Sequence, residues 1–425
     1  MFDESDLVDA KGRYLHWDEL RRRAPKGVDP RDVWTITKFH RSGLLKQIEL
    51  KAGNDAPFKY CVPDAAQRVL HTIDGLRSPI LTADSGVGGT REENDRFLVE
   101  SLMMEEAIAS AQLEGAATTR RVAKEMLESE RPPRNEHERM IVNNFLLMKQ
   151  AKQCKDEALS VDLLLRFHET ATQQTIDPYV IPGQLRTSDD VYVVDSEGGI
   201  AHQPPRAEWL PARLERLCQF AAEKHDGEDG RPFIHPAVKA IILHFMIGYE
   251  HPFVDGNGRT ARALFYWYML KTGYWPFEFI SISALLKVAA TAYGKAYLYT
   301  ETDDFDLTYF IDYQLQIIQR AVDNFLKYIE KKRREQFELM VWLDEVGISG
   351  KLNYRQGQLL RKVLQHPGRV FHVKEVKNDF GVAENTARAD LEKLVKLKVL
   401  AAAKDGKFIQ YVARADASEH LRKGS

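Results

Sequence analysis

The most constraining feature of this 425-residue sequence is a glycine-rich joint between two apolar helical runs. The run AVKAIILHFMIGYE precedes the joint and the run ARALFYWYMLKTG follows it, and both show the apolar spacing of helices. The joint reads HPFVDGNGR over residues 251–259. Because Pro252 disfavours the α conformation at the residue before it, the first helix is expected to end at His251. The sequence therefore predicts a helix–loop–helix unit around this joint.

The glycines of the joint predict an anion-binding turn. Gly256 and Gly258, on either side of Asn257, permit a backbone turn in which several N–H groups point inward. The turn leads into the N-terminus of the next helix, whose dipole also favours an anion. Arg259 and Arg262 are three residues apart on that helix, so one face can present both guanidinium groups to phosphate oxygens.

Two further side chains of the joint suit nucleotide chemistry. Asp255 offers a carboxylate of the kind that Mg²⁺ takes together with phosphate oxygens and water. His251 has an ordinary pKa near neutrality and can take a proton from an incoming hydroxyl. A base, a carboxylate, an anion-binding turn and two arginines in one short segment predict chemistry on a nucleotide.

Residues 251–262 resemble the Fic-family signature HPFx(D/E)GNGRxxR and match it at every fixed position. The family has a mostly helical core and usually transfers AMP from ATP to a hydroxyl side chain of a target protein. The resemblance implies that His251 is the general base and that Asp255 is the Mg²⁺ ligand. It assigns the binding of the phosphates to Gly256, Asn257, Gly258, Arg259 and Arg262. The intact GNG sequence argues against the related phosphotransferase branch of the family.

Residues 110–115, SAQLEG, resemble the inhibitory motif (S/T)xxxE(G/N) of the same family. In that family the glutamate pairs with the second arginine of the signature, here Arg262, and blocks the placement of the γ-phosphate. The chemistry is reasonable because a carboxylate and a phosphate compete for one guanidinium. We therefore expect Ser110 and Glu114 to be regulatory residues of an autoinhibited enzyme.

A β-hairpin is expected before the signature. Val191, Val193 and Ile200 alternate with polar residues on either side of Gly198 and Gly199. The resemblance implies a flap at this place that docks the target protein. Strand addition at an exposed edge would hold an extended target segment with little demand on its sequence. Val191 and Val193 are the expected docking residues.

The C-terminal part predicts a helix, a helix–turn–helix and a hairpin about Asp405 and Gly406, an order that resembles a winged helix. The third helix and the wing would offer polar and basic side chains to a partner: Asn385, Thr386, Arg388, Lys393, Lys396, Lys404 and Lys407. Acidic residues dilute this charge: Glu384, Asp390, Glu392 and Asp405. Two kinds of partner therefore stand as alternatives: DNA, or protein, including a second copy of the chain as a homodimer.

Composition bounds the environment. The formal net charge of -2 gives no general attraction to nucleic acid or membrane. The three cysteines are widely spaced and form neither a zinc pattern nor a disulfide framework. The N-terminal segment MFDESDLVDAKGRYL has no apolar run, and no stretch approaches a membrane span. We expect a cytoplasmic protein with no membrane partner.

The expected fold class is mainly α, in three parts. These are an α-rich N-terminal region (1–90), a helical Fic core with the inhibitory helix and the β-hairpin flap (91–330), and a linker helix with a winged-helix-like domain (331–425). The first boundary is the glycine-rich run at residues 82–90, and the second follows a predicted long helix that contains the basic run 331–334. A further joint is expected at residues 347–350, where two glycines stand three apart.

The expected function is adenylylation of a target protein. A Tyr, Thr or Ser hydroxyl of the target would attack the α-phosphorus of Mg²⁺-bound ATP while His251 takes its proton. One alternative is the reverse reaction, in which Glu114 holds a water and the same site removes AMP from a target. The other alternative is a DNA-binding regulator whose Fic core senses a nucleotide.

Overall fold

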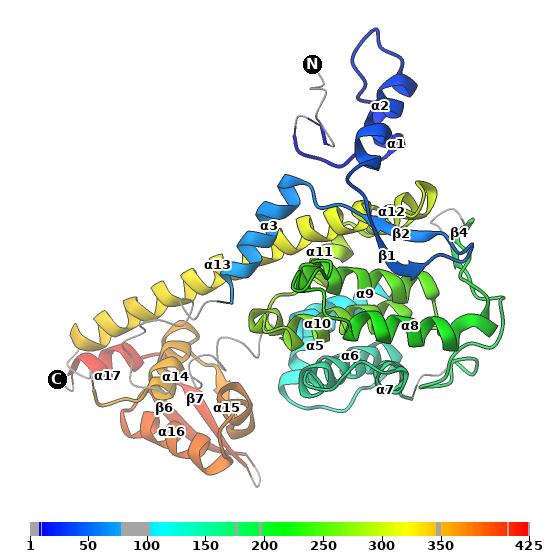
Figure 1. Cartoon of the computed structure of the whole chain (residues 1–425). Helices are drawn as coiled ribbons and strands as arrows, with labels where there is room; N and C mark the ends of the chain where they lie inside the picture. The colour runs from blue at the N-terminus through cyan, green and yellow to red at the C-terminus, as the bar shows by residue number, and fades with distance from the viewer. Residues whose placement is uncertain are drawn as a thin grey trace. The chain divides into compact units, whose positions relative to one another are not determined.

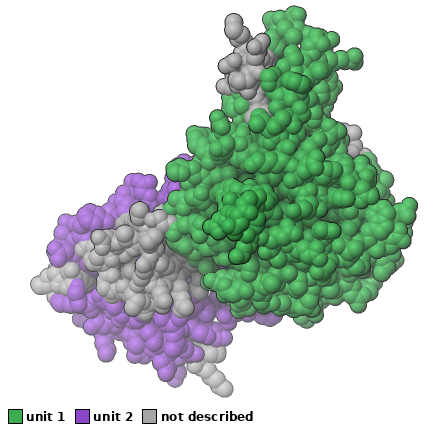
Figure 2. Space-filling model, viewed as in Figure 1, with its two compact units in different colours: residues 1–78, 105–118, 133–322 green, residues 79–104, 119–132, 323–425 purple. Residues whose placement is uncertain are grey.

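The chain forms two compact units, which Figure 2 distinguishes by colour. The computed structural model describes residues 8–9, 11–77, 103–174, 177–194, 198–345, 350–405 and 408–423. Unit 1 comprises residues 1–78, 105–118 and 133–322, and unit 2 comprises residues 79–104, 119–132 and 323–425. The predicted boundary run at 82–90 and residues 347–349 of the predicted joint lie outside the described residues.

The centre of unit 1 is a pair of buried helices, α9 (Pro236–Glu250) and α10 (Asn257–Lys271), which pack against each other (Figure 1). Both are buried over almost their whole length, as expected for helices that are apolar on most faces. Three further helices pack on this pair: α6 (Glu136–Gln153), α7 (Val161–Thr172) and α8 (Leu210–Ala222). The predicted helix–loop–helix unit is thus confirmed, and it lies in the core.

The N-terminal residues belong to the same unit. They form α1 (Trp17–Leu20), α2 (Pro30–Ser42), the antiparallel strands β1 (Lys46–Lys51) and β2 (Pro57–Tyr60), and α3 (Asp64–Gly75). Strand β1 packs against α8. Arg41 is buried, donates to the Tyr309 hydroxyl at 2.9 Å, and stacks its guanidinium 3.5 Å from the ring centroid of Tyr14. These contacts attach the N-terminal elements to the helices that follow the signature.

After α10 the chain forms short helices and then one long helix. These are η3 (Trp275–Glu278), α11 (Ser283–Val288), α12 (Ala290–Thr302) and α13 (Thr308–Glu345). Helix α13, drawn in yellow in Figure 1, is continuous through the basic run at 331–334. Its first residues belong to unit 1 and the residues from 323 onward to unit 2. The prediction of one long helix in this region is confirmed.

Unit 2 contains the expected winged-helix elements. In chain order they are α14 (Tyr354–Gln365), β5 (Val370–Phe371), α15 (Val373–Phe380), α16 (Glu384–Lys396), β6 (Leu400–Asp405), β7 (Phe408–Ala413) and α17 (Ala417–Lys423). The strands form one antiparallel sheet in the order β5-β7-β6. Gly381 ends α15 at φ +60°, a left-handed conformation that glycine adopts readily. Helix α5 (Arg120–Glu128) packs against α15.

The expected mainly α fold class is confirmed, since the sheets are small and helices form both units. Within the described residues, none of the helices combines the length and the apolarity that a membrane span requires.

Asp390 of α16 is predicted to hold unit 2 together. Its buried carboxylate accepts hydrogen bonds from Arg355 Nε at 2.8 Å and Gln356 Nε2 at 2.8 Å, at the start of α14. Asp390→Ala should lower the free energy of unfolding of the full chain by about 3 kcal/mol, because it removes the carboxylate partner of a largely buried guanidinium. Glu392→Ala, at an exposed position on the same helix, is the control and should change it by less than about 0.5 kcal/mol. Urea unfolding of both variants, monitored by circular dichroism, would measure this difference. Equal midpoints for the two variants would contradict the role of Asp390.

Candidate nucleotide site

The joint turns through two left-handed residues. Helix α9 ends at Glu250, and His251 follows at φ +44° and ψ +56°. Gly256 stands at φ +83° directly before α10 begins at Asn257. A left-handed conformation is ordinary for glycine and uncommon for histidine, so the contacts around His251 must stabilise it.

The side chain of Asn257 closes the joint. Its Oδ1 accepts from the backbone N–H of Phe253 at 3.0 Å, and its Nδ2 donates to the carbonyl of Phe253 at 2.8 Å. Both polar groups of Phe253 are therefore satisfied inside the fold, where water cannot reach them. The sequence placed Asn257 in the anion-binding turn, and the structure shows that its side chain also shapes the turn.

His168 of α7 supports the turn, and the sequence pattern did not predict this role. Its Nδ1 accepts from the N–H of Gly183 at 3.0 Å, so its Nε2 carries the proton and donates to the carbonyl of Asp255 at 2.9 Å. The ring stacks on Phe253, with the centroids 3.7 Å apart. Burial lowers the pKa of His168 to about 4, so the ring stays neutral at physiological pH. A single histidine in an ordinary helical run gives no spacing signal of such a role.

Arg259 and Asp255 form one side of the site. Arg259 NH2 pairs with Asp255 Oδ2 at 2.6 Å, and its NH1 donates to the carbonyl of Ala171 at 2.6 Å. The buried Nε of Arg259 has no hydrogen-bond partner among the described residues. The side chain of Asp255 is 52% exposed, which leaves carboxylate oxygen open to a further ligand.

Asp255 fits a magnesium ion only as one ligand among several. The described residues contain one cluster with metal-ligand spacing, Glu49, Glu223 and His225, and it does not include Asp255. A Mg²⁺ at Asp255 would take its other ligands from phosphate oxygens and water, which is the usual arrangement for this ion. The residues therefore suit a metal that is bound together with a nucleotide.

Arg262 forms the other side of the site and contacts the predicted inhibitory motif. Its Nε donates to the hydroxyl of Ser110 at 2.8 Å, and its NH2 pairs with Glu114 Oε1 at 2.8 Å. The arginine side chain is only 1% exposed, and its NH1 has no partner within the described part of the chain. The predicted pairing of Glu114 with Arg262 is confirmed as a contact.

The carboxylate of Glu114 lies directly over Gly258. A Cβ at Gly258 would overlap Glu114 Oε1 and would crowd Arg262 NH1. Only a glycine at this position lets an anionic oxygen come so close to the turn and to the arginine. Glu114 thus occupies the space directly beside Gly258 and Arg262.

The helix over residues 103–113, which precedes Glu114, is anchored at several points. The buried Glu106 accepts from the N–H of Ser283 at 3.0 Å and from the hydroxyl of Ser281 at 2.8 Å, and its burial raises its pKa. Asn144 Nδ2 donates to the carbonyl of Ala107 at 2.9 Å. These anchors hold Ser110 and Glu114 against Arg262, and the sequence did not indicate them.

The ring of His251, the expected base, has one nitrogen bound and one free to accept a proton. Its Nδ1 faces the carbonyl of Gly248 at 3.3 Å and must donate to it, so the neutral ring has its lone pair on Nε2. The pKa of His251 is lowered to about 4, mainly by burial and also by the nearby His202 and Arg186. The imidazole is therefore unprotonated at neutral pH, as a proton acceptor must be.

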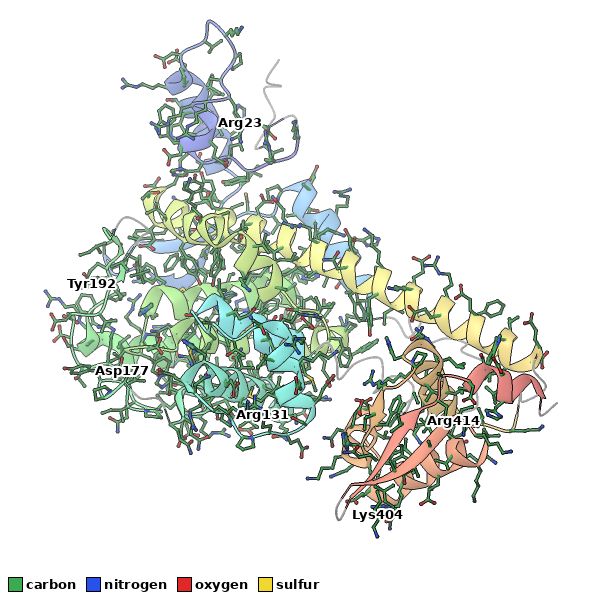
Figure 3. The ribbon with its side chains drawn as sticks, turned by 180° about the vertical axis from the view of Figure 1, so that it is seen from behind. Arg23, Arg131, Asp177, Tyr192, Lys404 and Arg414 are labelled. Atoms are coloured by element: carbon green, nitrogen blue, oxygen red, sulfur yellow. The ribbon has the colours of Figure 1, made fainter. Side chains whose placement is uncertain are left out.

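The predicted hairpin is present as the strands β3 (Val193–Val194) and β4 (Ile200–His202), which pair antiparallel. Val191 precedes β3, and both Val191 and Val193 are half-buried. The exposed side chains of the hairpin are Tyr192, Val194 and Ile200, and Figure 3 shows Tyr192 at its surface. Docking through Val191 and Val193 stays a prediction.

Comparisons with known proteins agree with this geometry. Residues 158–269 match the sequence model of the Fic/DOC family, and residues 355–406 match that of the DeoR-like helix-turn-helix domain. The chain is therefore similar to the Fic/DOC family over residues 158–269 and to DeoR-like helix-turn-helix domains over residues 355–406.

The curated relatives include proteins named protein adenylyltransferase Fic. The one from Nematostella vectensis is 29% identical over 122 residues, which cover 29% of this chain and 25% of that protein. The one from Drosophila virilis is 30% identical over 138 residues, which cover 32% of this chain and 26% of that protein. The similarity thus spans about a quarter of the length of these relatives.

Solved structures show the same fold. Fic-1 from C. elegans superposes with a TM-score of 0.50 at 16% identity, covering 74% of this chain and 82% of that one. A Fic domain containing signaling protein from Bacteroides thetaiotaomicron gives a TM-score of 0.50 at 19% identity, covering 62% and 97%.

The two hydrogen bonds between the Asn257 side chain and the Phe253 backbone should contribute measurably to the free energy of unfolding. Asn257→Ala would leave the buried N–H and carbonyl of Phe253 without side-chain partners, so the free energy of unfolding should fall by about 1–3 kcal/mol. Val254→Ala is the matched control, because Val254 lies in the same loop and is 40% exposed. Urea denaturation would measure both variants, and an Asn257→Ala midpoint as high as that of Val254→Ala would refute the bridging role.

Proposed function

We propose that this protein is an adenylyltransferase that moves AMP from ATP to a hydroxyl of a target protein and that Glu114 restrains it. The observation that carries the proposal is a pair of buried guanidinium nitrogens, Arg259 Nε and Arg262 NH1, which have no partner among the described residues. Both belong to the first turns of α10, beside the glycine turn. Buried donors are usually satisfied, so this cationic site is suited to a polyanion such as a triphosphate.

The proposed step is an in-line displacement at the α-phosphorus. The target oxygen bonds to the α-phosphorus, His251 Nε2 takes the hydroxyl proton, and the bond to the bridging oxygen breaks so that pyrophosphate leaves. The turn and the two arginines neutralise the charge on the phosphates. Magnesium, held by Asp255 when bound with the nucleotide, would add positive charge at the phosphates.

The proposed restraint follows from the contacts of Arg262. Its guanidinium already binds Ser110 and Glu114, and the carboxylate covers Gly258. A γ-phosphate on the turn would have to displace this carboxylate, because both anions need the same donors. ATP would then bind in a strained or misplaced manner until Glu114 moves away.

The hairpin supports a protein as the acceptor. Its exposed side chains Tyr192, Val194 and Ile200 are 49%, 55% and 61% exposed. An extended target segment could add to this edge through its backbone and cover these apolar side chains.

Glu114→Gly should raise transfer of labelled AMP, self-modification included, by about tenfold to a hundredfold. The reason is that a charged pair worth about 1.4–3 kcal/mol suppresses the competent state by that factor. The measurement is incubation of the full chain with labelled ATP and a cell lysate, followed by mass spectrometry of the labelled proteins. Glu114→Gln, which keeps the side-chain shape without the charge, should give a smaller increase.

The control is the double variant Glu114→Gly with His251→Ala. Its rate of AMP transfer should be about two to four orders of magnitude below that of Glu114→Gly. Wild-type or lower transfer by a folded Glu114→Gly protein would disprove the restraint. If the wild type instead releases AMP from a modified target and Glu114→Gly does not, the reverse reaction is the function of the site.

DNA binding by unit 2 is a second candidate function. The segment 351–425 contains 16 Lys and Arg against 8 Asp and Glu, although the whole chain has a net charge of -2. Asn385, Lys393 and Lys396 are exposed on α16, and Figure 3 shows Lys404 near the tip of the β6–β7 hairpin. This distribution, with the match to a DeoR-like helix-turn-helix domain, supports major-groove reading by α16 and phosphate contacts from the wing. Lys407 lies outside the described residues.

The double variant Lys393→Glu with Lys396→Glu should weaken binding of genomic DNA fragments by at least about tenfold, because it reverses two positive charges on the helix proposed to enter the groove. A gel shift at two salt concentrations, with and without ATP, would measure this. Lys295→Glu, exposed on α12 of unit 1, is the control and should leave binding unchanged. If the wild type gives no shift at low salt, unit 2 has a protein partner instead. An effect of ATP on the shift would favour the nucleotide-sensing regulator.

A further inference from the structure

Two cationic side chains cap the C-terminal end of α9, immediately before His251. His202 Nε2 donates to the carbonyl of Tyr249 at 2.7 Å, and Arg186 Nε donates to the carbonyl of His251 at 2.9 Å. A helix leaves its last carbonyls without internal partners, and the negative end of its dipole favours cations. Arg186 comes from the loop before the hairpin, and His202 is the last residue of β4.

Both ring nitrogens of His202 face hydrogen-bond acceptors. Nε2 faces the carbonyl of Tyr249, and Nδ1 faces Glu301 Oε2 on α12, each at 2.7 Å. A carbonyl and an ionised carboxylate only accept hydrogen bonds, so both contacts are hydrogen bonds at once only when both ring nitrogens carry protons. The side chains of His202 and Glu301 are 8% and 19% exposed, which places this pair inside unit 1.

The residue that follows these caps is held in a costly conformation. His251 has φ +44°, and a left-handed histidine persists only where its surroundings determine it. Arg186 binds this residue and also the next one, because its backbone N–H donates to the carbonyl of Pro252 at 2.9 Å. His202 fixes the preceding turn of α9 through Tyr249.

We propose that His202, with Glu301 as its counter-ion, is a positioning residue that clamps the end of α9 and so holds the His251 imidazole in its catalytic orientation. The inference rests on the proposed function, because it assumes that His251 is the base. It links three separate elements to one side chain: the hairpin strand β4, helix α12 and the signature joint.

The charge of His202 also bears on the basicity of His251. The charged groups that face His251 are His202 on β4, Arg186 on the preceding loop and Glu114 after the helix at 103–113. The neighbouring Glu250 is paired with Arg213 of α8 at 2.7 Å. Burial contributes most to the low pKa of His251, and the two cations keep the ring neutral against Glu114. Loss of the His202 charge should therefore raise the pKa of His251.

The test compares the two ends of one helix. His202→Gln keeps a donor near Tyr249 but removes the charge, and His235→Gln is the matched control. His235 caps the N-terminal end of α9, where its Nδ1 accepts from the N–H of Ala237 at 3.1 Å. In the Glu114→Gly full chain, His202→Gln should lower kcat about tenfold, leave the KM for ATP within about twofold, and move the acid limb of the pH profile upward. His235→Gln should change none of the three.

A second readout does not depend on transfer. With histidine labelled for NMR and the His251 resonance assigned by its loss in His251→Ala, the pKa of His251 should rise by about one pH unit in His202→Gln. It should not move in His235→Gln. If no variant transfers AMP but this shift occurs, the positioning role stands and the proposed function fails. If the Glu114→Gly protein transfers AMP and His202→Gln alters neither kcat nor the titration, the positioning role is wrong.

Glu301→Gln tests the same clamp if His202→Gln does not fold. It retains an oxygen acceptor for Nδ1 but removes the counter-ion. We expect a lower kcat with an unchanged KM for ATP, and kcat equal to that of the Glu114→Gly parent would also overturn the inference.

Discussion

The site depends on how two buried helices are joined. Helices α9 and α10 lie in the core, so the joint between them must reverse the chain and satisfy its own polar groups without water. Asn257 bridges Phe253, His168 binds the carbonyl of Asp255, and Arg186 binds that of His251. The anion-binding turn and the candidate base are therefore positioned by the packing of the core, which costs the site little reorganisation when a ligand binds.

A single guanidinium connects the chemistry with its proposed restraint. Arg262 is buried and binds Ser110 and Glu114, while Gly258 leaves room for one anionic oxygen above the turn. In the proposed mechanism a phosphate and the Glu114 carboxylate compete for that room, so the same glycine serves catalysis and inhibition. The preceding helix is itself anchored through Glu106, which binds Ser281 and Ser283.

Much of the fold and the centre of the site could be predicted, and the supporting residues could not. The signature helices, the hairpin and the winged-helix order follow from local apolar spacing and turn residues, which neighbouring positions display directly. His168, Glu106 and His202 have partners 87, 177 and 99 residues away, at Asp255, Ser283 and Glu301. No local pattern marks such a residue, because its role arises only when distant segments pack together.

By itself the sequence determined the helix–loop–helix joint, its glycine turn and the order of elements in the C-terminal domain, because glycine, proline and apolar periodicity act on the backbone locally. Only the tertiary structure decided that His251 has its lone pair on Nε2, that Glu114 covers Gly258, and that both ring nitrogens of His202 face acceptors. Protonation and competition for a site depend on which donors and acceptors face one another, and folding alone brings those groups together.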